Sequence, residues 1–196
     1  MDKVKTRSGK VVTDPPFVQQ LLNNPMFGWL WLVPRIWLGY KWLDSSLGKI
    51  TNPAWMNGGE ALKGFWSYAV TVPAEGRPPI AFGFYRDFIQ MLLDAQAYTW
   101  FAKLVATGEF LVGVALIVGA FTGIAAFFGG FMNWNFMMAG SASTNPLLFV
   151  IAVGLILAWK VSGYIGLDYF LLPIIGTPWQ HEKSPRAVLE PAPAGD

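Results

Sequence analysis

The feature that most constrains this chain is a series of apolar stretches, each long enough to cross a bilayer as a helix of about 20 residues. The first covers about 26–43. Two more lie almost back to back between 100 and 139, with a Gly- and Thr-containing break at 119–123. The fourth begins at an Asn-Pro pair, which suits a helix start, and covers 145–163. The sequence therefore predicts an all-α polytopic membrane protein, a four-transmembrane-helix bundle.

The composition agrees with a chain that faces lipid. Hydrophobic residues make up 54% of the sequence and charged residues 13%, whereas a soluble domain carries roughly 25% charged residues. The 14 Lys and Arg against 12 Asp and Glu leave a net charge of +2. That is too little for the basic face of a nucleic-acid-binding protein. We expect the lipid bilayer as a partner and no nucleic acid.

The residues that hold inorganic redox centres are almost absent. The chain has no Cys, and its one His, His181, lies in a Pro-rich tail. This excludes disulfides, thiolate zinc, covalently attached haem and a pair of His ligands to haem within the chain. We expect no haem, iron–sulfur or metal site here. Any electron carrier is then an organic molecule or belongs to another subunit.

The chain divides into a polar N-terminal tail at 1–24, a membrane domain at 25–176 and a polar C-terminal tail at 177–196. The first 24 residues hold four Lys and Arg, whereas the long segment at 50–97 holds three. Because Lys and Arg gather on the cytoplasmic side, we expect both termini in the cytoplasm of a bacterial or archaeal cell. The protein then lies in the inner membrane, without a signal peptide.

The segment at 50–97, between the first two spans, is rich in aromatic residues. It has helical patterns near 59–70 and 80–96, and in the second Phe84, Phe88 and Met91 recur at helical spacing. This predicts an amphipathic helical outer loop. Such a loop either lies at the membrane interface as an anchor or covers the mouth of the bundle.

Two ionisable residues fall near the middle of the predicted spans, where a charge is costly and needs a partner or a cavity. Arg35 lies near the middle of the first span and Glu109 near the middle of the second. Because these spans run in opposite directions, we expect an Arg35–Glu109 ion pair at matching depth. The pair either fixes the helix register or leaves Glu109 to pass protons to a reducible ligand.

A group of polar residues is expected at the outer end of the bundle, beneath the aromatic loop. It comprises Asp44, Asn133, Asn135, Ser141, Ser143 and Asn145. Asn133 and Asn135 are two residues apart, about 200° of rotation on a helix, so only one can face the bundle centre. The group forms either a polar pocket or a set of interhelical hydrogen bonds with a helix cap.

Three segments carry a family resemblance: PRIWLGYKWLDSSLGKI in the first span, GEFLVGVALIVGAFTG in the second, and NWNFMMAGSASTNPLLFVIAVGLILAWKVSGYIGLDYFLLP. They resemble the DoxX/DoxD family of small four-helix membrane proteins, over about 25–175. The GSASTNP and GYIGLDYFLLP strings are the most specific, because apolar composition alone does not produce them. The positions that match the family's recurrent charged residues are Arg35 and Glu109, with Asp168 in the terminal GLD.

The resemblance implies a redox-linked membrane subunit. The family is named for the large subunit of thiosulfate:quinone oxidoreductase, which oxidises thiosulfate to tetrathionate and passes electrons to membrane quinone. On this interpretation Glu109 and Arg35 are the candidate catalytic residues and quinone is the ligand. The small DoxA-type partner would be a separate polypeptide, so we expect other protein subunits as partners.

An anionic substrate would bind at the outer mouth. The candidate substrate-binding residues are Asp44, Asn133, Asn135, Ser141 and Asn145 of the polar group above, together with Arg86 and Lys103. Lys63 and Arg77 are the other cations of that region. The alternative is a non-catalytic structural subunit of a larger respiratory or photosynthetic complex, which the high aromatic content favours. A small-solute transporter is the weakest hypothesis, because the chain shows no inverted repeat.

Overall fold

The computed structural model describes residues 14–176. Within this range every regular element is a helix. Two parts of the predicted tails lie outside the described residues: 1–13 of the N-terminal tail and the whole C-terminal tail, 177–196, which contains His181.

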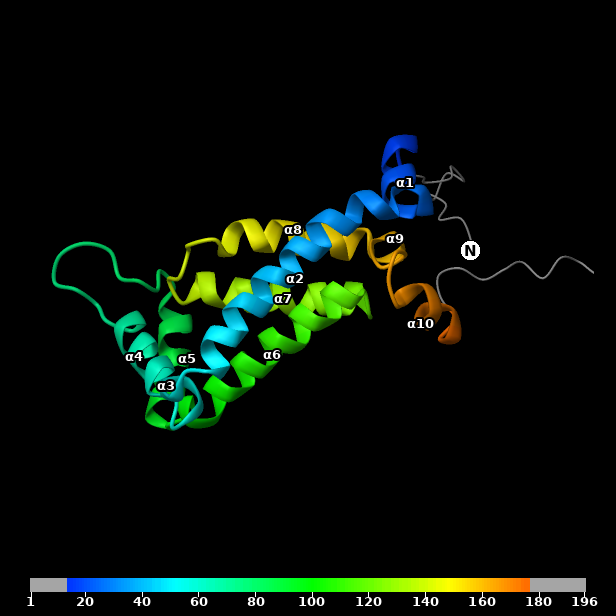
Figure 1. Ribbon diagram of the computed structural model, residues 1–196. Helices are drawn as coiled ribbons and strands as arrows, with labels where there is room; N and C mark the ends of the chain where they lie inside the picture. The colour runs from blue at the N-terminus through cyan, green and yellow to red at the C-terminus, as the bar shows by residue number, and fades with distance from the viewer. Residues whose placement is uncertain (1–13, 177–196) are drawn as a thin grey trace, which may run out of the picture.

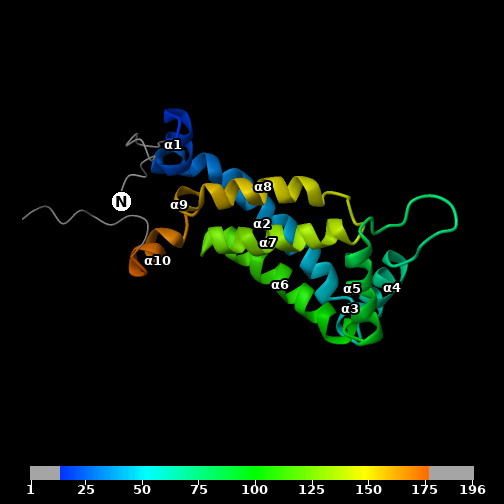
Figure 2. The same cartoon turned by 180° about the vertical axis from the view of Figure 1, so that it is seen from behind.

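Four long helices form a bundle. They are α2 (Gly28–Ile50), α6 (Tyr98–Val118), α7 (Thr122–Met138) and α8 (Asn145–Leu157), and α9 (Trp159–Ser162) follows directly on α8. Figures 1 and 2 show them side by side. The four predicted stretches are therefore helices, although the first extends well beyond its expected end.

Short helices lie at one end of this bundle. They are α1 (Pro16–Asn23), the 3-10 helix η1 (Pro25–Phe27) and α10 (Asp168–Ile174). Figure 1 shows α1 and α10 at the same end. The described chain thus enters and leaves the bundle at one end, as an even number of antiparallel long helices requires.

The opposite end carries a small helical unit that we call the cap, comprising α3 (Pro53–Met56), α4 (Glu60–Ala69) and α5 (Gly83–Asp94). Helices α4 and α5 match the two helical patterns expected in the long loop. The cap has its own hydrophobic cluster, which includes the start of α6: Leu62, Trp66, Ala69, Ile80, Ile89, Ala97, Tyr98 and Ala102. The loop is therefore a packed structure over one end of the bundle.

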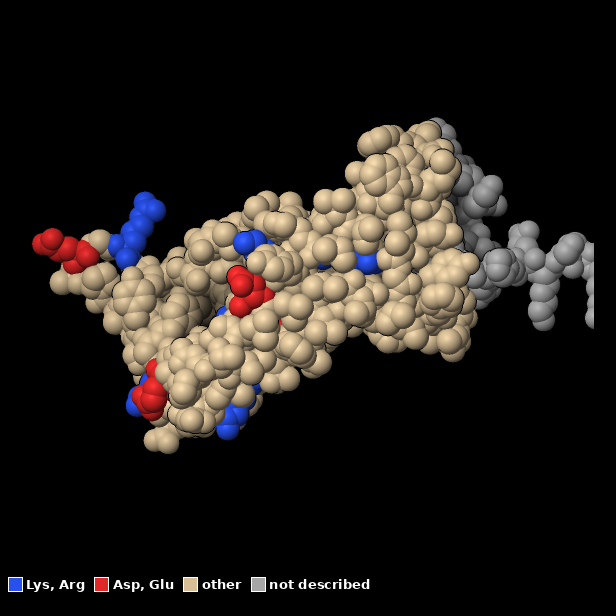
Figure 3. Space-filling view, viewed as in Figure 1, with Lys and Arg blue, Asp and Glu red and all other residues tan. Residues whose placement is uncertain are grey.

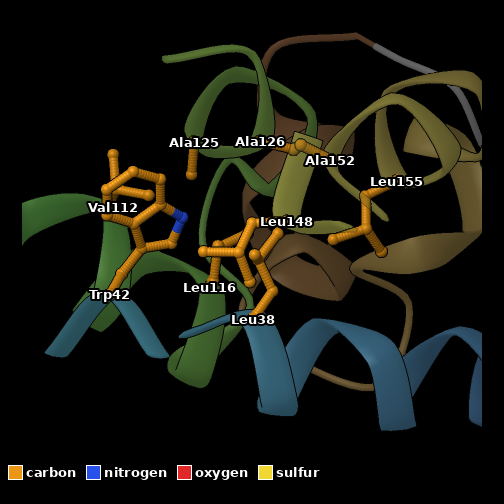
Figure 4. Packing of buried hydrophobic residues seen from close by; sticks show 9 residues of the cluster. All are labelled: Leu38, Trp42, Val112, Leu116, Ala125, Ala126, Leu148, Ala152 and Leu155. Carbon is orange, nitrogen blue, oxygen red and sulfur yellow. The ribbon is translucent and has the colours of Figure 1, made fainter. Parts of the chain in front are cut away.

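The bundle has a separate core, in which large and small side chains alternate (Figure 4). Its buried members are Leu38, Trp42, Val112, Leu116, Ala125, Ala126, Leu148, Ala152 and Leu155. Helices α2 and α6 approach closely where Gly39 meets Gly113, since a Cβ on Gly39 would lie 3.1 Å from the Gly113 carbonyl oxygen. Small residues thus allow the backbones of these two helices to approach closely.

The outside of the bundle is apolar. Large hydrophobic side chains such as Val33, Leu111 and Val150 are more than half exposed. On the face shown in Figure 3 the charged side chains gather mainly toward the cap. Within residues 14–176, α6 is the one helix long and apolar enough by itself to cross a membrane.

Candidate functional site

A cavity of about 980 Å³ lies between the cap and the adjoining parts of α2, α6 and α7. The face in Figure 3 is hollowed where the cap meets the bundle. Ten of the residues that line it are aromatic: Trp42, Trp55, Phe65, Trp66, Tyr85, Phe88, Phe101, Phe128, Phe131 and Phe136. Pockets for small organic molecules measure about 300–1,000 Å³ and combine apolar walls with a few polar groups. The cavity has the size and lining of such a site.

One ion pair lies in the wall of this cavity. Lys49 Nζ, near the end of α2, donates to Glu109 Oε2 at 2.8 Å. The Glu109 side chain is fully buried and that of Lys49 is 19% exposed. Lys49 also donates to Ser45 Oγ at 2.6 Å, and its ammonium lies 5.3 Å from the centre of the Trp55 ring. The buried carboxylate therefore has a cation that α2 and α3 hold in place.

Two cavity-lining residues have a buried polar atom without a hydrogen-bond partner among residues 14–176. These atoms are Glu109 Oε1 and Trp42 Nε1. Trp42 Nε1 lies against α7, where a Cβ on Gly129 would be 3.0 Å away, and Figure 4 shows it turned into the core. The other atom, Glu109 Oε1, belongs to a residue that lines the cavity and is itself covered by neighbouring protein atoms.

The expected polar group is only partly at the cavity. Asp44, Asn135, Ser141, Ser143 and Asn145 line it, and Asn133 does not. Asn133 is fully buried, and neither of its amide atoms has a partner among the described residues. Asn135 Nδ2 donates to the Phe131 carbonyl and Asn145 Nδ2 to the Ser141 carbonyl, each at 2.8 Å. These residues thus serve local backbone bonding as well as the cavity wall.

A tyrosine joins the cap to the bundle beside the cavity. The Tyr85 hydroxyl, on α5, donates to Asn135 Oδ1 at 3.0 Å and lies 3.2 Å from the Asn135 carbonyl oxygen. Burial raises the pKa of Tyr85 above its usual value. The hydroxyl therefore stays protonated and able to donate at neutral pH.

The predicted anion-binding cations lie away from the cavity wall. Arg86 is half-buried on α5 and Lys103 is exposed on α6, and neither lines the cavity. Lys63 pairs with Glu60 at 3.3 Å, and this carboxylate raises the pKa of Lys63. The cations that do line the cavity are Lys41 and Lys49.

The expected Arg35–Glu109 ion pair is wrong. Glu109 pairs with Lys49, which lies 14 residues beyond Arg35 on α2, about 21 Å along the helix axis at 1.5 Å per residue. Helices α2 and α6 are antiparallel as expected, but their register differs from the one that would pair Arg35 with Glu109. Arg35 lies level with Gly119, at the far end of α6.

Arg35 forms a closed site at the end of the bundle opposite the cap. Its side chain is 2% exposed. One terminal nitrogen donates to the Ser162 carbonyl at 2.9 Å and the other to the Ile165 carbonyl at 2.8 Å. Asp168 supplies a negative charge nearby. Arg35 thus holds the end of α9 and the segment after it against α2.

Asp168 completes this site, which we call the Arg35 junction. Its carboxylate accepts hydrogen bonds from the backbone N–H groups of Phe121, at 2.5 Å, and Thr122, at 2.8 Å. These donors at the start of α7 have no partner within the helix, and an acidic side chain suits the helix N-terminus. Glycines keep the space open, because a Cβ on Gly119 would lie 2.6 Å from the Arg35 guanidinium and one on Gly163 would overlap Asp168.

The sequence analysis missed Lys49, Ser45 and Trp42 as site residues. These three side chains are spaced i, i+3 and i+7 along α2 and all line the cavity. That spacing places residues on one face of a helix. A polar and aromatic stripe at the end of the first span was the signal available for finding them.

Comparisons of the chain with protein-family models, with curated proteins and with solved structures find no match.

Proposed function

We propose that the protein is a four-span integral membrane protein in which α2, α6, α7 and α8 cross the bilayer. At 1.5 Å per residue these helices measure about 35, 32, 26 and 20 Å, and α9 extends α8 by a further turn. The hydrocarbon core is about 30 Å thick. Outward-facing side chains on the four helices are apolar over much of their length, including Trp29, Val33, Val114, Ile124, Phe127, Leu147, Val150 and Leu157.

The charges of α2 fit this arrangement. Arg35 is buried in its junction, and Lys49 is bonded to Glu109 inside the protein. Lys41 and Asp44 line the cavity near the cap. Lipid would therefore meet mainly apolar and aromatic side chains on α2, despite its four charged residues.

The distribution of basic residues supports one orientation. With the four Lys and Arg of the N-terminal tail in the cytoplasm, the cap and the cavity face the outer side. The membrane is then the inner membrane of a bacterial or archaeal cell.

Within this frame we propose a quinone-reactive subunit of a DoxX-type redox complex. The observation that carries the proposal is the aromatic cavity with a buried, ion-paired carboxylate in its wall. A quinone ring is flat and apolar with polar oxygens at its edge, which suits aromatic walls that enclose a few polar groups.

The proposed reaction takes electrons from thiosulfate or a related sulfur compound. Two thiosulfate ions join through a new S–S bond to give tetrathionate and release two electrons. One quinone takes up these two electrons with two protons and becomes a quinol. We assign the sulfur chemistry to a partner subunit, and to this chain the binding of quinone and the delivery of protons through Glu109.

The test uses membranes that contain the full chain with its natural partners. Addition of thiosulfate should reduce a short-chain ubiquinone, and the loss of quinone absorbance measures this reduction. The Glu109→Gln variant should lose this activity while keeping its expression and its elution volume in detergent. Glu60→Gln is the matched control, because Glu60 lies on the surface of the cap with its side chain 62% exposed.

Two results would contradict the proposal. Full activity of Glu109→Gln removes Glu109 from the reaction. Stable co-purification with a larger complex, with no quinone turnover even when all subunits are present, supports the structural-subunit alternative instead.

A further inference from the structure

The two members of the Lys49–Glu109 pair differ in how many of their donors and acceptors have a hydrogen-bond partner. A lysine ammonium has three N–H donors and no acceptor. The Lys49 ammonium donates to Glu109 Oε2 at 2.8 Å, to Ser45 Oγ at 2.6 Å and to the Ser45 carbonyl at 3.4 Å. Its donors are therefore all engaged by the protein.

The Glu109 carboxylate, by contrast, has an acceptor without a hydrogen-bond partner. An ionised carboxylate only accepts hydrogen bonds, and Glu109 Oε1 accepts none from residues 14–176. This oxygen belongs to a fully buried side chain that lines the cavity. The Ser45 hydroxyl accepts from Lys49 and interacts with Glu109 in turn, so it too is engaged by the pair. The group is thus left with one free acceptor, Oε1, directly beneath the cavity wall.

This imbalance discriminates between the two oxidation states of a quinone. A quinone carbonyl is only an acceptor, so against the ionised form of Glu109 it gains no hydrogen bond and leaves Oε1 unpaired. A quinol hydroxyl donates, and a hydrogen bond from O–H to a carboxylate is among the stronger kinds in proteins. A buried carboxylate oxygen without a hydrogen bond costs binding free energy, and the quinol hydroxyl removes this cost by donating to it.

We propose, on the basis of the proposed function, that this cavity binds the hydroxyl-bearing quinol form more tightly than the quinone form. In the bound quinol the hydroxyl donates a hydrogen bond to Glu109 Oε1. Tighter binding of the reduced form raises the reduction potential of the bound couple. A tenfold preference corresponds to about 30 mV for a two-electron couple. The site would thus make its quinone a better acceptor for electrons from a weak sulfur reductant.

The direct test measures binding to the wild-type full chain in detergent, without oxygen, by quenching of tryptophan fluorescence. The probes are menadione, menadiol and menadiol dimethyl ether. Menadiol should bind about tenfold or more tightly than either of the others, since a hydrogen bond to a charged group is worth about 1.5–3 kcal/mol. The ether keeps the ring and both oxygens but has no O–H to donate.

The outcomes separate the inference from the function on which it rests. If none of the three probes binds, the quinone site itself is wrong. If all three bind with equal affinity, or menadione binds most tightly, the cavity takes the ring but Glu109 does not select the hydroxyl, and this inference is overturned.

A variant provides an independent measurement. Glu109→Gln replaces the free carboxylate oxygen by an amide, which has both an acceptor and two N–H donors. The ratio of menadiol to menadione affinities should fall toward one, while Glu60→Gln keeps the wild-type ratio. A purely structural role of Glu109 would weaken both probes together and leave the ratio unchanged, which would also overturn the inference.

Discussion

The two ends of the bundle each hold one cation from α2 and one acid from another part of the chain, but they are built differently. At the Arg35 junction the guanidinium bonds backbone carbonyls and Asp168 bonds backbone N–H groups. At the cap end Lys49 and Glu109 bond each other beside a cavity, and one carboxylate oxygen stays free. The first arrangement joins chain segments, whereas the second leaves an unpaired carboxylate oxygen in a residue that lines a cavity.

The comparison shows why a charge inside an apolar bundle does not by itself mark a functional site. Arg35 and Glu109 share burial, depth within a long helix and an ionisable side chain. They differ in what their polar atoms meet. Arg35 bonds two backbone carbonyls and keeps Nε unpaired away from the large cavity, whereas Glu109 keeps Oε1 unpaired in a residue that lines that cavity. An unpaired group beside a cavity is the one that a ligand can satisfy.

The largest expected effect is at the Arg35 junction. Arg35→Met removes the donors to two buried carbonyls and leaves Asp168 without its nearby cation, which should cost about 3–5 kcal/mol of unfolding free energy. Thermal unfolding in detergent, followed by far-ultraviolet circular dichroism, measures it. Lys41→Met is the control, because Lys41 contacts the Trp37 and Tyr40 rings and has no carboxylate partner within 4 Å among the described residues. Equal stability of the two variants would show that the junction contributes nothing.

The next effect tests the glycines that keep the junction open. Gly119 has φ of +69°, and a Cβ there would press on the Arg35 guanidinium. Gly119→Ala should therefore cost about 2–3 kcal/mol, from backbone strain and displacement of Arg35. Gly48→Ala is a matched change in α2, where a Cβ meets nothing within 4 Å, and it should stabilise by about 0.5–1 kcal/mol. The same thermal assay should give the two substitutions opposite signs; a stabilising Gly119→Ala contradicts the proposed packing.

The helices of this fold could be read from the sequence because their signals are local. The break at 119–123 is found where Gly119 takes a left-handed conformation as the C-cap of α6. The Asn-Pro pair at 145–146 begins α8, and the two helical patterns of the long loop are α4 and α5. Each of these features depends on residues within a few positions of one another.

The pairing of charges could not be read in the same way. Hydrophobicity gives the depth of a residue only to within a few turns, and it says nothing of how far two antiparallel helices slide past each other. Lys41 and Asp44 lower the apolarity of the first span, so its expected end fell near 43 although α2 continues to Ile50. A span that ends near 43 excludes Lys49, and Arg35 is then the cation whose depth near the middle of the span matches that of Glu109.

A third prediction compares removal of both charges at each end. Glu109→Gln alone should destabilise by about 1–2 kcal/mol, because the unpaired Lys49 is partly exposed and can turn toward water in the cavity. Adding Lys49→Met should restore most of this loss. At the other end, Arg35→Met with Asp168→Asn should stay unstable, since the Ser162 and Ile165 carbonyls remain unpaired. Thermal unfolding of these four variants, together with the single variants Lys49→Met and Asp168→Asn, measures the two couplings.

The contrast between the two double variants is the decisive part of that experiment. Recovery at the cap end means that the ion pair is retained for its chemistry and not for the fold. Recovery at the Arg35 junction instead would mean that the two charges serve only each other, and the distinction drawn between the ends would be lost.

The smallest effect concerns the attachment of the cap. Tyr85→Phe removes the hydroxyl that donates to Asn135 and should cost about 1 kcal/mol. Because the cap has its own hydrophobic cluster, we expect the loss to appear as faster hydrogen exchange in α5 and not as global unfolding. Tyr68→Phe is the control, since Tyr68 is 66% exposed on α4. If exchange in α6 and α7 accelerated as much as in α5, the cap and the bundle would unfold as one unit, and the cavity between them could not open without disrupting the Lys49–Glu109 pair.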